Sequence, residues 1–333
     1  MMFNDDDAPE EATFPLLGLP NQVIKRVINQ MSIFRIFGLS LISKRSCKLV
    51  SDSYHNKWGP AVTIGNAIQI SIDLSTHFTF RPSHEEIDQS PIQKVKLAGP
   101  VNTWTGYDYY SKPGYTMKDW VDHIFKTFNC PYDKVYFGWQ NNTGKYSVAS
   151  VKRIFPKCDR LMINISNPQF ELVTDTLLPK FIEVGRNVFE ELHLTKRMQK
   201  IQMQNFSHVV FSNIASFDTL LMANSKCFEV SAFNLTDKEA NRFLKLWTRG
   251  AMPNLQHFSS AVRRGTQSME ETIERVFRGI KHSYSIEHIQ CRECSSRKCG
   301  GFVVYRVGGT RAVVNLYPDN SDEYFLFDIF VEH

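Results

Sequence analysis

Four residues near the C-terminus have the types and spacing of a metal site. The pattern is H-x-x-C-x-x-C with a further cysteine five residues on, formed by His288, Cys291, Cys294 and Cys299. Zinc takes four such ligands in a tetrahedron. However, a single C-x-x-C arises often by chance, and these ligands lie too close together to enclose a usual finger loop. We therefore expect packed cysteines beside a loop, with no metal and no cofactor.

Sequence motifs of the common enzyme classes are absent. The chain has no Walker loop, dinucleotide fingerprint, nucleophile elbow or H-E-x-x-H. Because the members of a catalytic triad need not be adjacent in sequence, an enzyme that uses a pocket of the fold stays an alternative. The sequence favours a protein that binds other molecules and carries no catalytic residues.

The composition predicts about two domains and a packed core. The chain has 333 residues, of which 42% are hydrophobic. Residues 1–13 are acidic, lack the pattern of a signal peptide, and are expected to form a disordered tail. No stretch is long enough to cross a bilayer. The seven cysteines are mostly scattered, which indicates a reduced protein of the cytoplasm or nucleus.

The segment from Phe14 to Val50 has the pattern of three short helices. Pro20 suits the first turn of a helix, and apolar residues recur at helical spacing from Val23 to Met31. Ser32 is placed to cap a second helix, and the residues from Leu39 onward outline a third. A segment of this size buries too little of its own surface to be stable alone. Its apolar side chains therefore need the rest of the chain or a partner.

This segment resembles an F-box, the module by which substrate receptors dock on the Skp adaptor of a cullin–RING ubiquitin ligase. FPLLGLP and LSLISK are similar in particular to the F-box of a family expanded in nematodes. The resemblance implies an F-box over residues 14–57 that contacts the adaptor through Leu16, Leu19, Pro20, Ile24, Ile28 and Leu39. A helical cap on the following domain is the alternative.

Apolar, strand-like pieces recur along the rest of the chain at irregular intervals of about 25 to 37 residues. They lie at 133–139, 159–165, 190–194, 217–223, 255–260 and 286–291, after an earlier strand at 62–74 and a short one near 95–97. Such a period suits stacked strand–helix units that cover each other's apolar faces. We expect an α/β fold with a leucine-rich-repeat-like domain over residues 58–333, beginning near Lys57. A compact α/β sheet is the alternative.

The residues from Thr236 to Pro253 specify a helix most clearly. Thr236 and Glu239 form a capping box, apolar residues follow at helical spacing, and Gly250 and Pro253 end the helix. The pattern T-D-x-x-x-N-x-F-L-x-x-W, which ends at Trp247, resembles the signature of the type 2 F-box-associated domain in the same family.

The C-terminus has the pattern of a β-hairpin followed by another strand. Strand-like runs at 302–307 and 312–316 flank Gly308 and Gly309, which suit a primed turn. Arg306, Gly309 and Ala312 also resemble the family's R-x-D-G-x-x-A pattern. A further apolar strand is expected from Tyr324 to Val331.

The folded part of the chain is basic. The whole chain has a net charge of +5 although its N-terminal tail is acidic, so the remainder is more basic than that. The basic residues nevertheless come in short groups without the aromatic interleaving of a nucleic-acid platform. A solvated surface is the simpler interpretation, and its sign favours an acidic protein partner. Because exposed loops usually carry recognition, the substrate-binding residues expected here are Lys196, Arg197, Lys200, Arg263 and Arg264.

Together these patterns predict a non-catalytic adaptor. The resemblance implies a substrate-recognition subunit of a Skp–cullin–F-box ubiquitin ligase, which binds the Skp adaptor through the F-box and a protein substrate through the C-terminal domain. The alternative is a repeat-type binding protein for nucleic acid or an acidic protein, with no ubiquitin role.

Overall fold

The structure, a computed structural model, is a mixed α/β fold, as the sequence predicted. It describes residues 18–54, 59–73, 75–89, 91–99, 107–140, 144–164, 167–185, 196, 199–201, 203–212, 216–263, 268–294, 296–318 and 323–332. The tail at 1–13 and Lys57 lie outside this set. The chain forms two compact units. The first consists of Met1–Pro60, Gln69–Ser83 and Asp88–Pro131, and the second of Ala61–Ile68, His84–Ile87 and Tyr132–His333.

These units differ from the predicted division into residues 14–57 and 58–333. The N-terminal helices share a unit with strands and a helix that extend to Pro131. The physical reason is the apolar surface of the helices, which they bury against those later elements.

Three of the four described helices of the first unit begin with a side chain that caps them. The four helices are α1 (Asn21–Ile28), α2 (Ile33–Ile42), α3 (Lys44–Ser51) and α4 (Met117–Thr127). Pro20, predicted in the first turn, instead lies just before α1 and makes no side-chain cap hydrogen bond, whereas the Ser32 side chain accepts a hydrogen bond at the start of α2 as predicted. Ser43 and Thr116 begin capping boxes. Helices therefore form where the N-terminal pattern placed them.

The strands of the first unit follow the order β2-β3-β4-β5. They are β2 (Ile68–Ser71), β3 (His77–Phe80), β4 (Val95–Ala98) and β5 (Tyr107–Tyr110). The short strand predicted near 95–97 is β4. The strand predicted over 62–74 is interrupted by a turn, in which the Gly65 N–H donates to the Ala67 carbonyl at 3.0 Å. Its first half is β1 (Ala61–Ile64).

Phe37, on α2, lies at the centre of the first unit's core. Its side chain is fully buried, and its ring centroid is 4.7 Å from that of Phe78 and 5.0 Å from that of Tyr110. The ring of His123 lies 5.8 Å away, and its Nε2 is 2.8 Å from the Ser40 hydroxyl. Burial is the main cause that lowers the pKa of His123 to about 4, so this imidazole is neutral near pH 7.

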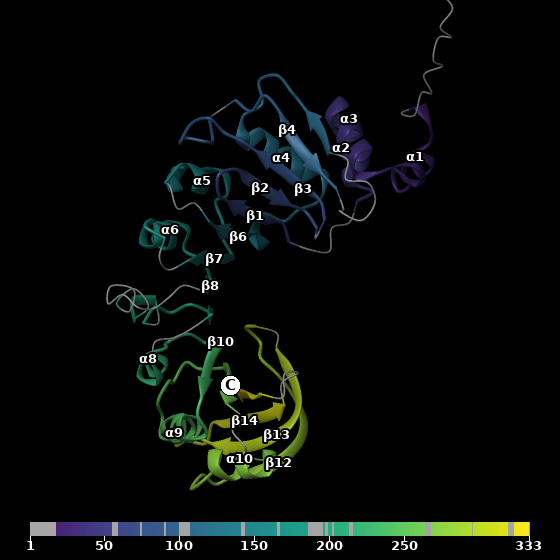
Figure 1. The fold of residues 1–333 in the computed structure, drawn as a ribbon. Coiled ribbons are helices and arrows are strands. Elements are labelled where there is room, and N and C mark those ends of the chain that lie inside the picture. Colours follow the sequence, from purple (N-terminus) through teal and green to yellow (C-terminus); the bar gives the residue numbers. More distant parts are fainter. Residues whose placement is uncertain are drawn as a thin grey trace, which may run out of the picture. The chain divides into compact units, whose positions relative to one another are not determined.

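Parallel strands follow one another in chain order through the second unit (Figure 1). They are β1, β6 (Tyr136–Trp139), β7 (Arg160–Asn164), β8 (Phe181–Gly185), β9 (His208–Phe211), β10 (Cys227–Leu235) and β11 (His257–Arg263). The helices between them are η2 (Tyr132–Lys134), α5 (Val148–Ile154), α6 (Phe170–Leu177), α8 (Phe217–Leu221) and α9 (Asp237–Thr248). This order is compatible with stacked strand–helix units, while the leucine-rich-repeat class stays a prediction.

One predicted strand of the second unit is wrong. Residues 217–223 begin with helix α8, which buries Phe217 and Leu220, three residues apart. A short apolar run does not distinguish a buried strand from a buried helix by its periodicity. The segment at 190–194 lies outside the described residues, whereas the strands predicted at 133–139, 159–165, 255–260 and 286–291 are present as β6, β7, β11 and β12.

The chain ends in an antiparallel meander that continues the sheet beyond β11. Its elements are α10 (Met269–Val276), β12 (Ser283–Gln290), β13 (Arg297–Tyr305), β14 (Arg311–Pro318) and β15 (Tyr324–Val331). The hairpin is confirmed, since β13 and β14 pair antiparallel on either side of Gly308 and Gly309. The connection is longer than the predicted two-residue primed turn, because Tyr305 and Arg311 form the last pair and the Gly309 N–H donates to the Arg306 carbonyl at 2.9 Å. Within the described ranges, no helix has both the length and the apolar character to span a bilayer.

Candidate functional site

The first helix has a wide apolar surface, of which the protein covers only part. Ile24 and Ile28 are 0% and 1% exposed, whereas Val23 and Val27 beside them are 42% and 36% exposed. Ile42, at the end of α2, is 70% exposed. Exposed apolar side chains on adjacent turns of one helix mark a surface that a partner can cover.

The residues predicted to contact an adaptor divide between surface and core. Leu19 is half-buried and Pro20 is exposed, so both reach the surface. Ile24, Ile28 and Leu39 are buried within the protein, and they support the helices from inside. Leu16 lies outside the described residues. The sequence shows that the apolar stripe of α1 is wide enough to include Val23 and Val27. Only the packing shows that the rest of the protein covers the isoleucines and leaves these valines exposed.

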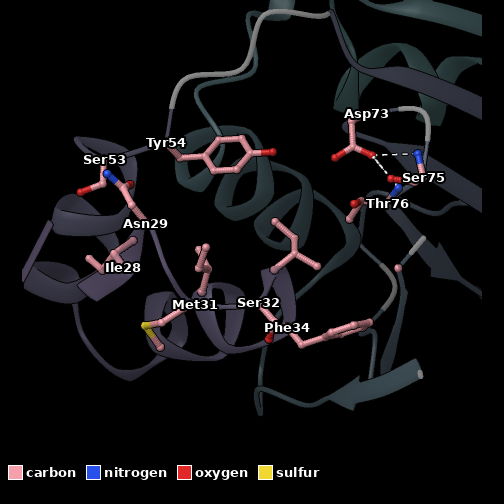
Figure 2. A pocket seen from close by; sticks show the side chains of 13 residues that line it. Ile28, Asn29, Met31, Ser32, Phe34, Ser53, Tyr54, Asp73, Ser75 and Thr76 are labelled. Atoms are coloured by element: carbon pink, nitrogen blue, oxygen red, sulfur yellow. Dashed lines mark hydrogen bonds between the residues drawn. The ribbon is translucent and has the colours of Figure 1, made fainter. Parts of the chain in front are cut away.

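A cavity of about 600 Å³ lies beside these helices (Figure 2). Its walls are mainly the apolar residues from the end of α1 to α2, with polar groups from the turn between β2 and β3 on one side. The lining residues are Ile28, Asn29, Met31, Ser32, Ile33, Phe34, Ile36, Ser53, Tyr54, Asp73, Ser75, Thr76 and Gly99.

Asp73 is the acidic residue of this cavity, and the turn already occupies its carboxylate. One oxygen accepts hydrogen bonds from the Ser75 N–H and hydroxyl and from the Thr76 N–H, at 2.7–2.9 Å. Burial would raise the pKa of Asp73, but these hydrogen bonds lower it below its usual value. The Asp73 carboxylate therefore stabilises the turn. The apolar walls suit the cavity to binding an apolar group.

The helix motif of the second unit positions neighbouring elements. Thr236 and Glu239 form the predicted capping box at the start of α9. The Asn241 side-chain amide donates to the carbonyl groups of Val276 and Arg278, at 2.8 and 3.0 Å. It therefore satisfies orphan carbonyl groups at the end of α10, and the asparagine of the motif has a structural role.

The apolar residues of the same motif form the core of the second unit. Phe243, Leu244 and Trp247 are each 0% exposed, as their spacing predicted. The Phe243 ring stacks on that of Phe258 with centroids 4.5 Å apart. The Arg306 guanidinium lies 4.7 Å from the Trp247 ring and donates to the Trp247 carbonyl at 3.2 Å.

Arg306 connects the two motifs that carried the resemblance. Its Nη2 also donates to the carbonyl groups of Ala251 and Met252, at 2.6 and 2.9 Å. An arginine beside the C-terminal end of a helix satisfies orphan carbonyl groups and opposes the partial negative charge there. The residues of both motifs thus hold α9, α10 and the hairpin together.

The basic residues predicted to bind a substrate lie at the surface where they are described. Lys196, Lys200 and Arg263 are exposed, while Arg197 and Arg264 fall outside the described residues. Lys200 lies 3.8 Å from Asp175, and such an exposed pair contributes little to stability. Substrate binding by these residues stays a prediction.

The four residues with metal-ligand spacing do not meet as a group. His288 and Cys299 are exposed partners across β12 and β13. Cys291 and Cys294 instead approach Cys227, which lies more than sixty residues earlier in the chain. Spacing alone could not identify this group, because its members come from different strands.

Comparisons with known proteins identify the region that contains α9. Residues 197–260 match the family described as F-box associated. The chain is 23% identical over 324 residues to the F-box associated domain-containing protein sdz-33 of Caenorhabditis elegans, with 92% of this chain and 94% of that protein covered. No solved structure matches the chain. Both similarities support the resemblance to a nematode F-box-associated family that the motifs indicated.

Proposed function

We propose that this protein is the substrate-recognition subunit of a Skp–cullin–F-box ubiquitin ligase. The observation that carries the proposal is the exposed apolar surface of Val23, Val27 and Ile42 on the N-terminal helices of an F-box-associated protein. In this proposal α1, α2 and α3 form the F-box, and a Skp adaptor covers their exposed apolar residues. A cullin then joins through the adaptor.

The proposal gives the two units different tasks. The buried residues of α1 and α2 keep the helices in place, while Leu19, Pro20 and the exposed valines contact the adaptor. The second unit, with leucine-rich-repeat-like strand–helix units, holds a protein substrate. The chain itself is not an enzyme, because other subunits transfer ubiquitin, and it acts in the cytoplasm or nucleus.

Adaptor binding is expected to fall at least tenfold when Leu19 and Pro20 are both replaced with alanine. Interfaces concentrate their energy in a few anchors, each worth about 2 kcal/mol or more on truncation. Val23→Glu and Val27→Glu should have a similar effect, because they place charges on the same surface without disturbing the core. Binding of purified variants to a Skp adaptor, measured by calorimetry, checks this.

Gln22→Ala and Arg26→Ala provide the matched control, since both residues are exposed polar residues of the same helix. These changes should leave the affinity within about twofold. Unchanged affinity in all the apolar variants would contradict the F-box proposal. Salt-dependent binding of nucleic acid, without adaptor binding, would favour the repeat-type alternative.

Charge reversal at Lys196 and Arg263 is expected to slow association with an acidic substrate while changing the free energy of unfolding by no more than about 0.5 kcal/mol. Exposed charges act mainly through long-range steering, so the salt dependence of association should fall too. Kinetics of substrate capture at two salt concentrations, with melting curves of the same variants, test this. If capture is the same for variant and wild type at both concentrations, the basic surface has no role in recognition.

A further inference from the structure

Three cysteine thiols from two distant parts of the chain meet in the second unit. Cys227 is the first residue of β10, whereas Cys291 and Cys294 lie in the turn between β12 and β13. The Sγ atoms of Cys227 and Cys291 are 3.4 Å apart, and all three sulfurs lie within 4.8 Å of one another. All three cysteines are free thiols. The cluster is therefore a set of soft ligands gathered around one point.

The curvature of the sheet produces this cluster. In the sheet order, β13, β14, β15 and β11 separate β12 from β10, so the two ends can touch only if the meander curls back, as the green and yellow strands do in Figure 1. An ion pair fastens the turn beside the cysteines, with Lys226 Nζ 2.6 Å from Glu293 Oε1. These two residues directly adjoin Cys227 and Cys294.

His257 supplies an imidazole next to the thiols. It is the first residue of β11 and the parallel neighbour of Cys227 in the sheet. Its side chain is buried, and its Nδ1 lies 3.4 Å from the Cys294 sulfur. The same nitrogen is 3.8 Å from Glu229 Oε1, while that carboxylate also lies 3.0 Å from His208 Nε2. Cys294 therefore belongs both to the cluster of three thiols and to a second group of potential ligands, which it forms with Glu229 and His257.

We propose that Cys227, His257, Cys291 and Cys294 bind one structural zinc ion. Zinc prefers a tetrahedron of thiolate sulfur and imidazole nitrogen, and Cys₃His is one of its usual sets. With metal–sulfur distances of about 2.3 Å, sulfurs around such an ion are roughly 3.8 Å apart. The separations of the sulfurs agree with this arrangement, and His257 Nδ1 lies 3.4 Å from one of them, that of Cys294. The proposal departs from the expectation, made from the sequence, that these cysteines hold no metal.

Groups around the four residues have the character of an outer shell. On the other side of the imidazole, His257 Nε2 is buried and lies 4.0 Å from Asp328 Oδ1. A metal-binding histidine commonly points its second nitrogen at a carboxylate.

Asp328 is the buried carboxylate beside the imidazole of His257. It is 3% exposed, and its other oxygen accepts a hydrogen bond from the Tyr317 hydroxyl at 2.9 Å. Tyr317 in turn accepts from Lys298 Nζ at 2.6 Å. Lys298 Nζ also lies 3.9 Å from this second oxygen, so the charge of Asp328 is paired on that side. The first oxygen, which faces His257 Nε2, is the one that would orient a metal-bound imidazole. We assign Asp328 the role of a positioning residue.

The site would join the turn between β12 and β13, at the edge of the sheet, to β10 and β11 farther along the strand order. Its ligands come from β10, from β11 and from the turn between β12 and β13, so one ion would hold together segments that are distant in sequence. Because all four positions are protein ligands, the ion would have no open position for a substrate. A structural zinc site of this kind is coupled to folding.

The test begins with metal analysis of the full-length wild-type protein. We expect one zinc per chain after purification without added metal, and its release by a mercurial reagent that titrates thiols. Replacement by cobalt should give the intense visible absorption of tetrahedral sulfur coordination, and a chelator should lower the melting temperature. This measurement needs no variant, so it decides the proposal even if the variants fold poorly.

Variants then identify the ligands. Cys227→Ser, Cys291→Ser, Cys294→Ser and His257→Ala should each lose the bound zinc or the tetrahedral cobalt spectrum. Cys299→Ser and His288→Ala are the matched controls, since these residues lie in the same region but outside the cluster. Both controls should keep one zinc per chain. Asp328→Asn should keep the spectrum but release zinc more readily.

Several results would overturn the proposal. Wild-type protein without zinc, whether its thiols titrate as free groups or mass spectrometry shows a disulfide between Cys227 and Cys291, would exclude the site. Loss of zinc in Cys299→Ser or His288→Ala would assign the ion to other ligands. If Glu229→Gln released the zinc and His257→Ala retained it, His257 would not be the fourth ligand.

Discussion

Replacing Trp247 with alanine is expected to lower the free energy of unfolding by about 3–5 kcal/mol. The side chain is completely buried, so its removal loses apolar contacts and leaves a cavity that the neighbouring rings cannot fill. The Arg306 guanidinium would also lose the ring on which it lies. Because proteins are typically stable by only about 5–15 kcal/mol, this change is large enough to unfold much of the population at elevated temperature. Urea denaturation followed by circular dichroism measures it.

Trp247→Phe is the control for this experiment. Phenylalanine keeps an aromatic ring in the core, so the loss should be clearly smaller than in the alanine variant. The indole nitrogen of Trp247 has no hydrogen-bond partner among the described residues, so the control sacrifices no polar contact that the structure shows. A loss below about 1 kcal/mol in Trp247→Ala would mean that α9 does not pack as the structure has it.

Phe37→Ala should be about as destabilising, by about 3–5 kcal/mol. The ring is fully buried and packs edge-to-face on Phe78 and Tyr110, and such aromatic pairs add about 0.5–1.5 kcal/mol each beyond their burial. The experiment has a consequence for the domain division, because Phe37 lies on a helix of the proposed F-box. A large loss would show that this helix is part of the first unit's core. Thermal and urea denaturation of the full chain measure it.

Ile42→Ala supplies the contrast on the same helix. Ile42 is 70% exposed, so its truncation should change the free energy of unfolding by no more than about 0.5 kcal/mol. The proposed function nevertheless expects it to weaken adaptor binding. If Phe37→Ala and Ile42→Ala were equally mild in denaturation, α2 would not depend on the strands around it.

Local sequence signals were sufficient for individual helices and turns. Pro20, Ser32 and the Thr236–Glu239 capping box mark the starts of helices α1, α2 and α9. These predictions succeed because caps act within one turn of the chain. The motif of α9 also indicated the family to which the comparisons show similarity, although nothing in its spacing shows that Asn241 caps a second helix.

Short apolar runs were less informative. Residues 217–223 were expected to form a strand and instead begin with α8, because the packing of neighbouring elements decides such cases. The division of the α1 stripe into buried isoleucines and exposed valines is likewise a result of packing. A helical pattern shows that a surface is apolar, but the elements beside it determine how much of it is covered.

The sequence by itself determined where helices begin, which strands are apolar, and which family the chain resembles, since each of these depends on neighbours within a few residues. Only the tertiary structure decided that Cys227 and His257, rather than His288 and Cys299, lie beside Cys291 and Cys294. The physical reason is that the curl of a sheet sums the twist between many strands. No single segment carries that information, so ligands from separate strands become visible as one site only when the chain is folded.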